Sequence, residues 1–297
     1  MLIDLLKEQY NWVEGRFIDN DLIETDKGLK RIRYWSDKQL LDWHINWRDH
    51  CSDTPYLLVD RMLRTKEQQP FVSFEGAYVT VHDEIVEPFL IKGQESAVAS
   101  ALATFIHYGL KVESNREQHS STHLEKELFT ADHMFLETEG LTDYHFYRKE
   151  AIRREEKAAA LLQTTKSTRL PTLDPILSVK QVRTTANVLY WVGTMDEPIK
   201  GYVGLDQFFR EMFLQVGESS SRKLIEHLIE KLDRNQAIQL LAEIVKPNEW
   251  NNWSQHVALD NSRLAESFQR MQEQWEITKQ LVQIISMTID KKKVSIS

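Results

Sequence analysis

Glycine is scarce in this chain: ten of the 297 residues are glycine, about half of the ~7% share that is usual in globular proteins. No two of them lie closer together than Gly201 and Gly204. The Walker loop, the dinucleotide-binding fingerprint and the glycine loop of kinases need clustered glycines, so that backbone can approach a phosphate closely. The common phosphate-binding loops are therefore excluded.

Cysteine and long apolar runs are also missing. Cys51 is the one cysteine, which excludes a disulfide framework, a CxxC motif and a cysteine-based zinc site. No apolar stretch approaches the ~20 residues of a membrane-spanning helix. Asp4 interrupts the apolar start of the chain, so we expect no signal peptide. These absences predict an intracellular, cytoplasmic protein.

The charge balance is acidic, with a net charge of -8. Such a chain lacks the basic face that nonspecific binding to nucleic acid or to an anionic membrane needs. The nearest basic run, Lys291 to Lys293, is typical of a solvated tail. With 41% hydrophobic and 28% charged residues, the composition is that of a globular protein with a sizeable core. We expect neither a nucleic-acid nor a membrane partner.

The first 90 residues mix helical and strand-like patterns. Ser36 with Gln39 predicts a capping box for a helix that ends near Cys51. Its expected buried residues are Leu40, Leu41, Trp43, Ile45 and Trp47. A further helix is predicted over 2–12, and strands are predicted over 16–23, 29–35, 56–63, 70–75 and 77–81. Turn residues at 25–28 join the first two strands.

From about residue 95 the periodicity becomes mostly helical. Helices are predicted over 96–108, 120–138, 142–164 and, in several pieces, 205–290. Two strand-like segments, 176–182 and 187–192, interrupt them. The pattern predicts an α+β protein with its sheet at the N-terminus.

Three stretches carry a family resemblance. They are RMLRTKEQQPFVSFEGAYVTV at 61–81, ALATFIHYG at 101–109, and the ordered set of 187–190, 194–196 and 204–210. In this order they resemble the motifs of the protein-kinase-like fold in its aminoglycoside phosphotransferase and choline kinase branch. They are most similar to the spore-coat kinase-like proteins of endospore-forming bacteria.

The resemblance implies a two-lobed, protein-kinase-like fold. The N-lobe, 1–87, is expected to hold a five-stranded antiparallel sheet with one inserted helix. A larger helical C-lobe follows over 88–260, then a long amphipathic helix over 261–290 and a tail over 291–297.

The catalytic motifs of the family are degenerate here. The "H-G-D" that precedes the motif asparagine, Asn187, would fall on Lys180, Gln181 and Val182, and a valine cannot act as a base. The first aspartate of "D-F-D" would fall on Thr194, whose hydroxyl is a poor ligand for Mg²⁺. We therefore expect no catalytic residue and no metal ligand.

The phosphate-binding groups of the N-lobe are altered as well. The family's lysine would fall on Lys30 or Arg33, and the strand alternation favours Arg33. Its helical glutamate partner is missing from 37–49, where Asp42 is the nearest substitute. The glycine loop is absent over 15–28, since glycines stand only at its two ends.

The residues that remain outline a vestigial nucleotide pocket. Its expected members are Arg33, Asp83, Asn187, Thr194 and Asp196. Simpler interpretations stand beside it: Asn187 as a turn residue, Asp196 as a solvated acid, and Arg33 as part of a polar strand face. No cofactor is expected, and residual binding of ATP is the alternative.

Two other kinds of chemistry find little support. His119, His123, His133 and His145 lie among acidic residues, but no HExxH is present, so a solvated helix is favoured over a metal site. Ser120 to Thr122 lack a GxSxG setting. His50 is badly placed as a base for Cys51, because adjacent helical residues point about 100° apart.

An apolar stripe near the C-terminus leaves two alternatives open. It comprises Leu264, Phe268, Met271, Trp275, Val282 and Ile285. Such spacing predicts an amphipathic helix that either packs onto its own lobe or presents a surface to a partner.

The function favoured by the sequence is that of a catalytically inactive pseudokinase. It would act as a structural or interaction module with other proteins, among them spore-coat components, in the cytoplasm or the spore coat. One alternative is an active small-molecule phosphotransferase with Asp174 or Asp196 as a displaced base. The other is a helical adaptor of unrelated fold.

Overall fold

The computed structural model describes residues 1–53, 55–112, 143–166, 169–259 and 264–294. The chain divides into two compact units. The first comprises Met1–Leu90 with Val179–Pro198, and the second comprises Ile91–Ser178 with Ile199–Ser297. This division groups 179–198 with the first 90 residues, whereas the sequence places it in the helical lobe. The expected boundaries at 87 and 260 stay predictions.

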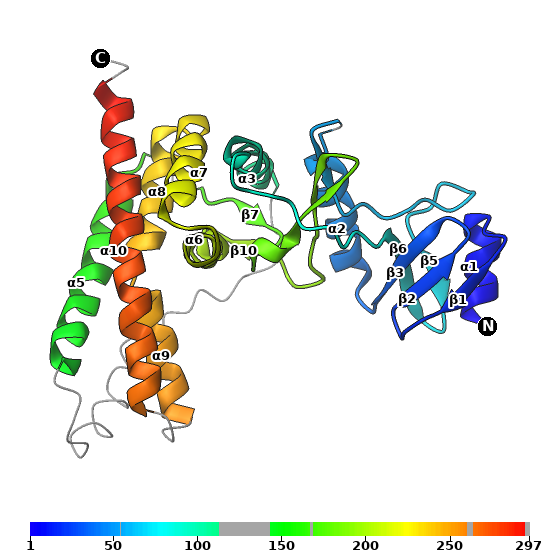
Figure 1. Cartoon of the computed structure of the whole chain (residues 1–297), viewed down its shortest axis with the longest axis horizontal. Helices are drawn as coiled ribbons and strands as arrows, with labels where there is room; N and C mark the ends of the chain where they lie inside the picture. The colour runs from blue at the N-terminus through cyan, green and yellow to red at the C-terminus, as the bar shows by residue number, and fades with distance from the viewer. Residues whose placement is uncertain (54, 113–142, 167–168, 260–263, 295–297) are drawn as a thin grey trace. The chain divides into compact units, whose positions relative to one another are not determined.

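The first unit contains a five-stranded antiparallel sheet (Figure 1). In the order β1-β2-β3-β6-β5, its strands are Gly15–Phe17, Leu22–Thr25, Gly28–Trp35, Ala77–Asp83 and Val72–Phe74. The prediction of a single strand over 16–23 is wrong, because this segment contains β1, a turn and the start of β2. The turn-forming residues Asp19, Asn20 and Asp21 end the first strand and start the second.

Helix α1, Leu2–Tyr10, packs against this sheet, as its periodicity predicts. The core between them consists of Leu2, Leu6, Tyr10, Trp12, Ile23, Ile32, Val72, Val79 and Val81. The helix ends at Asn11, whose left-handed backbone (φ 51°) stops the helical hydrogen bonding.

Helix α2, Lys38–Cys51, follows β3. Its cap is Asp37 and not the predicted Ser36: the Asp37 carboxylate accepts hydrogen bonds from the amides of Gln39 and Leu40. Leu41, Ile45 and Trp47 are buried as predicted, whereas Leu40 and Trp43 are only partly buried. The buried face also carries two polar residues, His44 and Arg48, which are fully buried.

A second sheet in the same unit joins segments far apart in the sequence. Strand β4, Leu57–Val59, pairs in parallel with β9, Val188–Trp191, which pairs antiparallel with β8, Val182–Thr185. Strand β4 is therefore shorter than the strand predicted over 56–63, and it belongs to a different sheet from β3 and β5, its neighbours in the sequence. The strand predicted over 176–182 is wrong, because 179–181 forms a 3₁₀ turn before β8.

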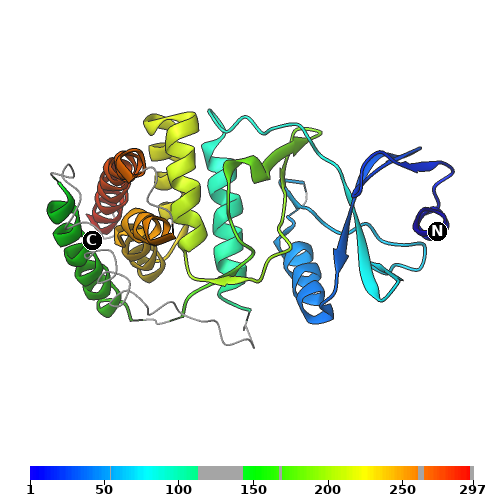
Figure 2. The same cartoon turned by 90° about the horizontal axis from the view of Figure 1, so that it is seen from below.

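Within its described residues, the second unit is helical apart from one short strand pair (Figure 2). The pair is β7, Thr172–Leu173, with β10, Ile199–Lys200. Its helices are α3, Glu95–Gly109; α5, Tyr144–Gln163; α6, Val203–Val216; α7, Glu218–Lys231; α8, Arg234–Val245; α9, Asn248–Leu259; and α10, Leu264–Val294. They confirm the helices predicted over 96–108, 142–164 and 205–290. The helix predicted over 120–138 lies outside the described residues.

Most of the C-terminal stripe is core, while Leu264 and Val282 are partly buried. Phe268, Met271 and Trp275 of α10 are buried in an aromatic cluster with Tyr144, Trp250 and Trp253. Further along the helix, Ile285 is fully buried. Helix α10 packs against α6, α7, α8 and α9, so the alternative in which the stripe faces its own lobe is confirmed.

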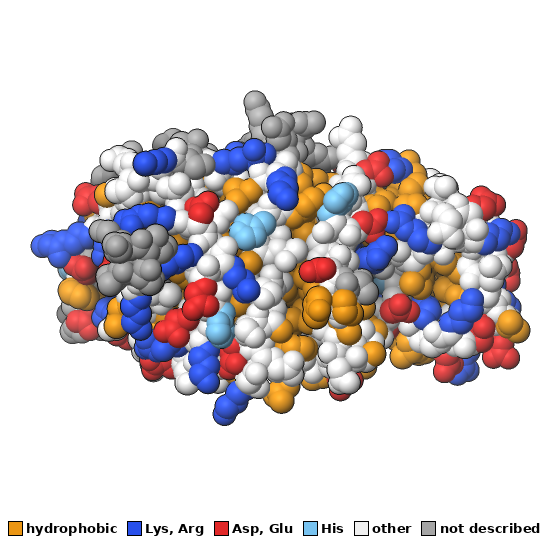
Figure 3. Space-filling view, turned by 90° about the horizontal axis from the view of Figure 1, so that it is seen from above, with side chains coloured by type: hydrophobic (Ala, Val, Ile, Leu, Met, Phe, Trp, Pro, Cys, Tyr) orange, Lys and Arg blue, Asp and Glu red, His pale blue; other side chains and the backbone are white. Residues whose placement is uncertain are grey.

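The C-terminal basic run is tied to the same unit. The ammonium group of Lys292 donates hydrogen bonds to the carbonyls of Ile229, Glu230 and Leu232 at the end of α7. The prediction of a solvated tail is therefore wrong for Lys292. No helix in the part of the chain that the structure describes is long and apolar enough to cross a membrane. On the face shown in Figure 3, basic and acidic side chains are interspersed.

Candidate functional site

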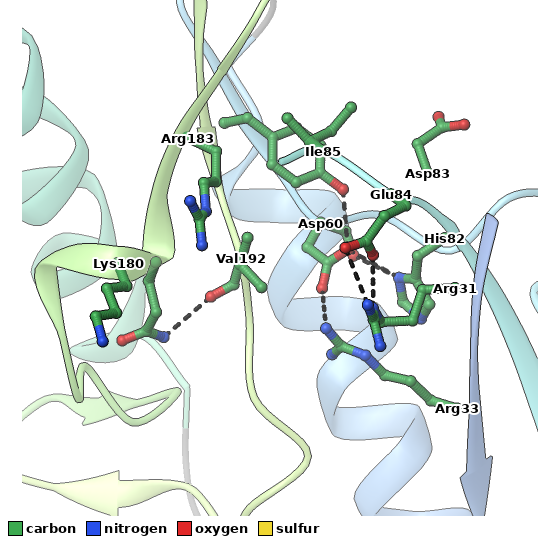
Figure 4. Close-up of a pocket in the computed structure, with 12 residues that line it drawn as sticks. Arg31, Arg33, Asp60, His82, Asp83, Glu84, Ile85, Lys180, Arg183 and Val192 are labelled. Carbon is green, nitrogen blue, oxygen red and sulfur yellow. Dashed lines mark hydrogen bonds and ion pairs between the residues drawn. The ribbon is translucent and has the colours of Figure 1, made fainter. Parts of the chain in front are cut away.

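A cavity of about 190 Å³ lies within the first unit (Figure 4). One wall of the cavity is built by strands β3 and β6 together with the residues that directly follow β4 and β6. The other wall is built by residues of the 3₁₀ turn, of β8 and of β9, and by Val192 directly after β9. The lining residues are Arg31, Arg33, Asp60, His82, Asp83, Glu84, Ile85, Lys180, Gln181, Arg183, Tyr190 and Val192.

Arg33, the expected substitute for the phosphate-binding lysine, is engaged within the protein. Its Nη2 lies 2.6 Å from the Oδ2 of Asp60, and the arginine and aspartate side chains are only 11% and 3% exposed. Its Nη1 donates to the carbonyls of Gly193 and Thr194, at 3.1 and 3.4 Å. Both ends of the guanidinium therefore already have acceptors.

Asp60 is the centre of a buried polar cluster. The Tyr190 hydroxyl donates to its Oδ1 at 2.9 Å, and the Nδ1 of His82 lies 3.0 Å from the same oxygen. On its other side, the Nε2 of His82 lies 2.9 Å from the hydroxyl of Thr80, which accepts from the Trp35 indole at 3.0 Å. A continuous set of hydrogen bonds thus fixes the ring of His82.

Burial and charge act in opposite directions on this cluster. Burial favours the neutral form of Asp60, but His82 and Arg33 outweigh it, so the pKa of Asp60 lies below its ordinary value. Burial lowers the pKa of His82; Asp60 opposes that effect and Arg33 adds to it. The pKa of Tyr190 is raised, first by burial and then by the Asp60 charge. These directions favour an ionised Asp60 beside a protonated Tyr190 hydroxyl near pH 7.

The remaining cations on strand β3 are also paired. Arg31 binds both carboxylate oxygens of Glu84, with nitrogen–oxygen distances of 2.5 and 2.9 Å, and also pairs with Asp21 in the β1–β2 turn. Lys30 lies 2.7 Å from the carboxylate of Asp83. These pairs connect the turn and the end of β6 to β3.

The segment that follows β9 is held by side chains of β3 and α2. The Thr194 carbonyl accepts from Arg48 as well as from Arg33, and the Asp196 carbonyl lies 2.9 Å from the Nε2 of His44. These contacts use backbone groups of 193–196, while the Asp196 side chain is exposed. The segment therefore presents no buried carboxylate to a metal ion.

The structure brings together two of the five predicted pocket residues. Arg33 and Asp83 line the cavity. Asn187 lies in the turn between β8 and β9, where it is exposed with a left-handed backbone (φ 64°). Thr194 and Asp196 lie in the segment after β9 and are not among the lining residues. Their assignment to a nucleotide pocket stays a prediction.

Asp60 is the residue that the sequence analysis missed. Asp42, proposed there as the partner of Arg33, pairs instead with Lys38 one turn away on α2. The sequence signal that could have identified Asp60 is its position directly after the short apolar strand Leu57–Val59. Of the positions that align with the family's catalytic motif, Lys180 and Gln181 line the cavity and Val182 is buried.

Residues that could hold a metal are not grouped in the part of the chain that the structure describes: no three His, Cys, Asp or Glu side chains there form a metal-binding cluster. His119, His123 and His133 lie outside the described residues, and His145 is exposed on α5. Cys51 is buried, while the Nδ1 of His50 bonds the carbonyl of Asn46.

The fold of this chain is similar to that of several solved phosphotransferase structures. An aminoglycoside phosphotransferase from Alicyclobacillus acidocaldarius matches with a TM-score of 0.64 at 13% identity, over 96% of this chain and 95% of its own. The AMP-bound spectinomycin phosphotransferase APH(9)-Ia matches with a TM-score of 0.54 at 15% identity, over 96% of each chain. The streptomycin–ATP complex of APH(2″)-IIa gives 0.50 at 12% identity, over 92% of this chain and 95% of its own.

The chain therefore has the kinase-like, two-lobed α+β fold of the aminoglycoside phosphotransferases, with an antiparallel-sheet N-lobe and a helical C-lobe. This result confirms the predicted fold class, and the alternative of a helical adaptor with an unrelated fold is wrong. No protein-family model and no curated protein matches the chain. The finer resemblance to spore-coat kinase-like proteins stays a prediction.

Proposed function

We propose that this chain is a catalytically inactive kinase-like protein that acts as a structural or interaction module. The observation that carries the proposal is the engagement of both ends of the Arg33 guanidinium. Its Nη2 pairs with the buried carboxylate of Asp60, as the phosphate-binding lysine of an active kinase pairs with a glutamate, but its Nη1 also donates to the carbonyls of Gly193 and Thr194. A phosphate group would therefore have to displace these backbone hydrogen bonds.

The β1–β2 turn supports the same proposal. Where the resemblance places a glycine loop, the turn carries Asp19 and Asp21. Asp21 is paired with Arg31, and two backbone amides of the turn are already used within the hairpin, so they are not free to bind a phosphate. The amides of Ile18 and Asp19 both donate to the carbonyl of Leu22.

The catalytic positions that the resemblance identifies support it as well. Val182, in the place of the base, is buried and cannot accept a proton. Thr194, in the place of a metal-binding aspartate, contributes its carbonyl to two arginines and its hydroxyl to the amide of Asp196. We infer that the protein uses no metal and no nucleotide cofactor.

The proposed partners are other proteins. The resemblance to spore-coat kinase-like proteins favours components of the spore coat, and a location in the cytoplasm or the coat. Neither nucleic acid nor a membrane is an expected partner, since the chain has a net charge of -8. Imaging a fluorescent fusion through sporulation of the source cell tests this setting; an even cytoplasmic signal throughout would contradict it.

Phosphate transfer is the test of inactivity. The purified chain is incubated with γ-labelled ATP and Mg²⁺ or Mn²⁺, together with pools of aminoglycosides, amino alcohols and proteins. We expect no labelled product and no release of ADP above a protein-free control. Transfer that depends on enzyme concentration would overturn the proposal.

An active small-molecule phosphotransferase is the second candidate. It is favoured by the fold, which matches known phosphotransferases over more than 90% of both chains, and Asp174 is a nearly buried carboxylate directly after β7. This candidate predicts a rise in melting temperature with millimolar ATP and Mg²⁺, because a ligand of the native state stabilises it. An unchanged melting temperature would remove it.

A further inference from the structure

Two guanidinium groups converge on the backbone of the segment after β9, residues 193–196, which we call the strap. The carbonyls of Gly193 and Thr194 accept hydrogen bonds from the Nη1 of Arg33 at 3.1 and 3.4 Å. The Thr194 carbonyl also accepts from the Nη2 of Arg48. Arginine forks of this kind bind the oxygens of carboxylates and phosphates most strongly. The carbonyl oxygens of the strap therefore stand where an oxyanion could bind.

Helix α2 also holds the other end of the strap. The carbonyl of Asp196 lies 2.9 Å from the Nε2 of His44, and this nitrogen is the donor because a carbonyl oxygen only accepts. Within the strap, the amide of Asp196 donates to the hydroxyl of Thr194 at 3.2 Å. His44 and Arg48, the two residues of α2 that bind the strap, are fully buried. The donors are thus fixed by the core of the first unit.

The side chains of the strap itself contribute little to the core. Met195 is 37% exposed, the Asp196 side chain is exposed, and Thr194 is only partly buried. Gly193 is buried but has no side chain to pack. Lifting the strap would therefore expose little apolar surface, and segments with few buried apolar contacts open locally at a low cost in free energy.

Lifting the strap would leave the buried ion pair of Arg33 intact. The Nη2 of Arg33 lies 2.6 Å from the Oδ2 of Asp60, whereas the strap accepts from Nη1. An open strap would thus free one end of the Arg33 guanidinium and the Nη2 of Arg48 together. Hydrogen bonds from guanidinium to phosphate oxygens are stronger than those to neutral carbonyls, so a phosphate group can replace the strap at these donors.

We propose that the strap is an autoinhibitory element, which occupies an oxyanion site at Arg33 and Arg48 with its own backbone. In the closed state, its carbonyls bind these donors; in the open state, the donors bind a phosphate group. The affinity for phosphate is then reduced by the fraction of molecules in which the strap is open. The inference rests on the proposed function, because it makes the engagement of Arg33 a state that the protein can leave.

Calorimetric titration with inorganic pyrophosphate, which offers phosphate groups without a nucleoside, compares the wild type with two opened variants. His44→Leu removes the donor to the Asp196 carbonyl, and Thr194→Val removes the hydroxyl that accepts from the Asp196 amide. Neither variant alters an arginine. Each should strengthen pyrophosphate binding about fivefold or more, because losing one hydrogen bond shifts the closed–open equilibrium by about that factor. His50→Leu, at an exposed position of the same helix, should bind like the wild type.

Two further measurements place the effect at the strap and at Arg33. Hydrogen exchange of residues 193–197 should be about threefold faster or more in His44→Leu than in the wild type, while β3 keeps its rate. Adding Arg33→Lys to His44→Leu keeps a cation beside Asp60 but supplies one nitrogen instead of a planar fork. This second substitution should weaken pyrophosphate binding again by about fivefold.

The outcomes separate the two claims. The inference is overturned if the opened variants bind pyrophosphate no more tightly than the wild type, if Arg33→Lys leaves the gained binding unchanged, or if exchange of 193–197 is the same in His44→Leu. Should His44→Leu fail to fold, Thr194→Val carries the binding and the Arg33→Lys comparison in its place. Phosphate transfer from ATP by the wild type would overturn the proposed function instead. Unchanged binding in the variants, with no transfer by the wild type, would remove only the inference.

Discussion

Among single residues, Asp60 has three polar side-chain partners in the first unit: Arg33, His82 and Tyr190 all contact its carboxylate. Replacing it by asparagine removes the negative charge and leaves Arg33 without an anionic partner. We expect Asp60→Asn to lower the free energy of unfolding by about 3–5 kcal/mol. Urea denaturation of the variant and the wild type measures this difference. The matched control is Asp42→Asn, because the side chains of Asp42 and its partner Lys38 are 50% and 37% exposed. A change beyond ~1 kcal/mol there would contradict the distinction between buried pairs and pairs open to solvent.

His82 predicts a pH dependence of stability. Its pKa is lowered in the folded protein, so the unfolded state takes up protons first as the pH falls below about 6.5. The stability contributed by neutral His82 is therefore present above that pH and is lost on acidification. We expect the melting temperature to fall between about pH 7.5 and 5.5, with a smaller slope in His82→Gln. Exposed His145→Gln should keep the wild-type slope, and equal slopes in all three proteins would refute this account.

Close packing requires a glycine at position 204. A Cβ added at Gly204 would lie 2.7 Å from the carbonyl oxygen of Ile176 and 3.0 Å from its nitrogen, both of which are backbone atoms. Gly204→Ala should therefore lower the free energy of unfolding by about 1–3 kcal/mol, as measured by denaturant titration. Gly15→Ala is the control, because its Cβ would meet only the side chains of Ile3 and Lys7. Similar losses in both variants would argue against backbone contact as the cause.

Among the helices and strands, the sequence predicts those that are determined by residues near one another in the chain. Helices α2, α3 and α10 follow from apolar periodicity, and the β5–β6 hairpin follows from its turn at Glu75–Gly76. The position of β4 does not follow, because its partner β9 lies more than a hundred residues further along the chain. The predicted cap of α2 is off by one residue, since Ser36 and Asp37 are both good capping residues and the sequence alone does not choose between them.

The end of α7 carries a prediction at the element scale. Its last carbonyls accept from Lys292 of α10, at 2.7 to 3.0 Å, which satisfies groups that a helix terminus leaves unpaired. Lys292→Met should lower the free energy of unfolding by about 1 kcal/mol. Lys279→Met, on the same helix but in an exposed pair with Glu276, should change it by less than ~0.5 kcal/mol. Thermal denaturation of the two variants side by side decides whether the contact stabilises the unit.

At the scale of the whole molecule, the order of the motifs was enough to predict the fold class, which the solved structures confirm. The site was predicted only in part. Strand alternation identified Arg33, and Asp83 lies on the neighbouring strand; both line one cavity. Asp60 was missed because its role depends on β4 lying beside β9, a contact that local patterns do not encode. Asn187, which the resemblance assigns to the family's motif asparagine, lies in the turn between β8 and β9, and its place in a nucleotide pocket stays a prediction.

The central claim is that this kinase-like protein does not use ATP, because Val182 stands in the place of the base and the guanidinium of Arg33 is engaged by Asp60, Gly193 and Thr194. Calorimetric titration of the intact chain with ATP in excess Mg²⁺ tests that claim most directly. The account predicts no saturable heat up to about 5 mM nucleotide, which corresponds to a binding free energy weaker than ~3 kcal/mol. A saturable isotherm with a dissociation constant in the micromolar range, accompanied by release of ADP, would contradict it.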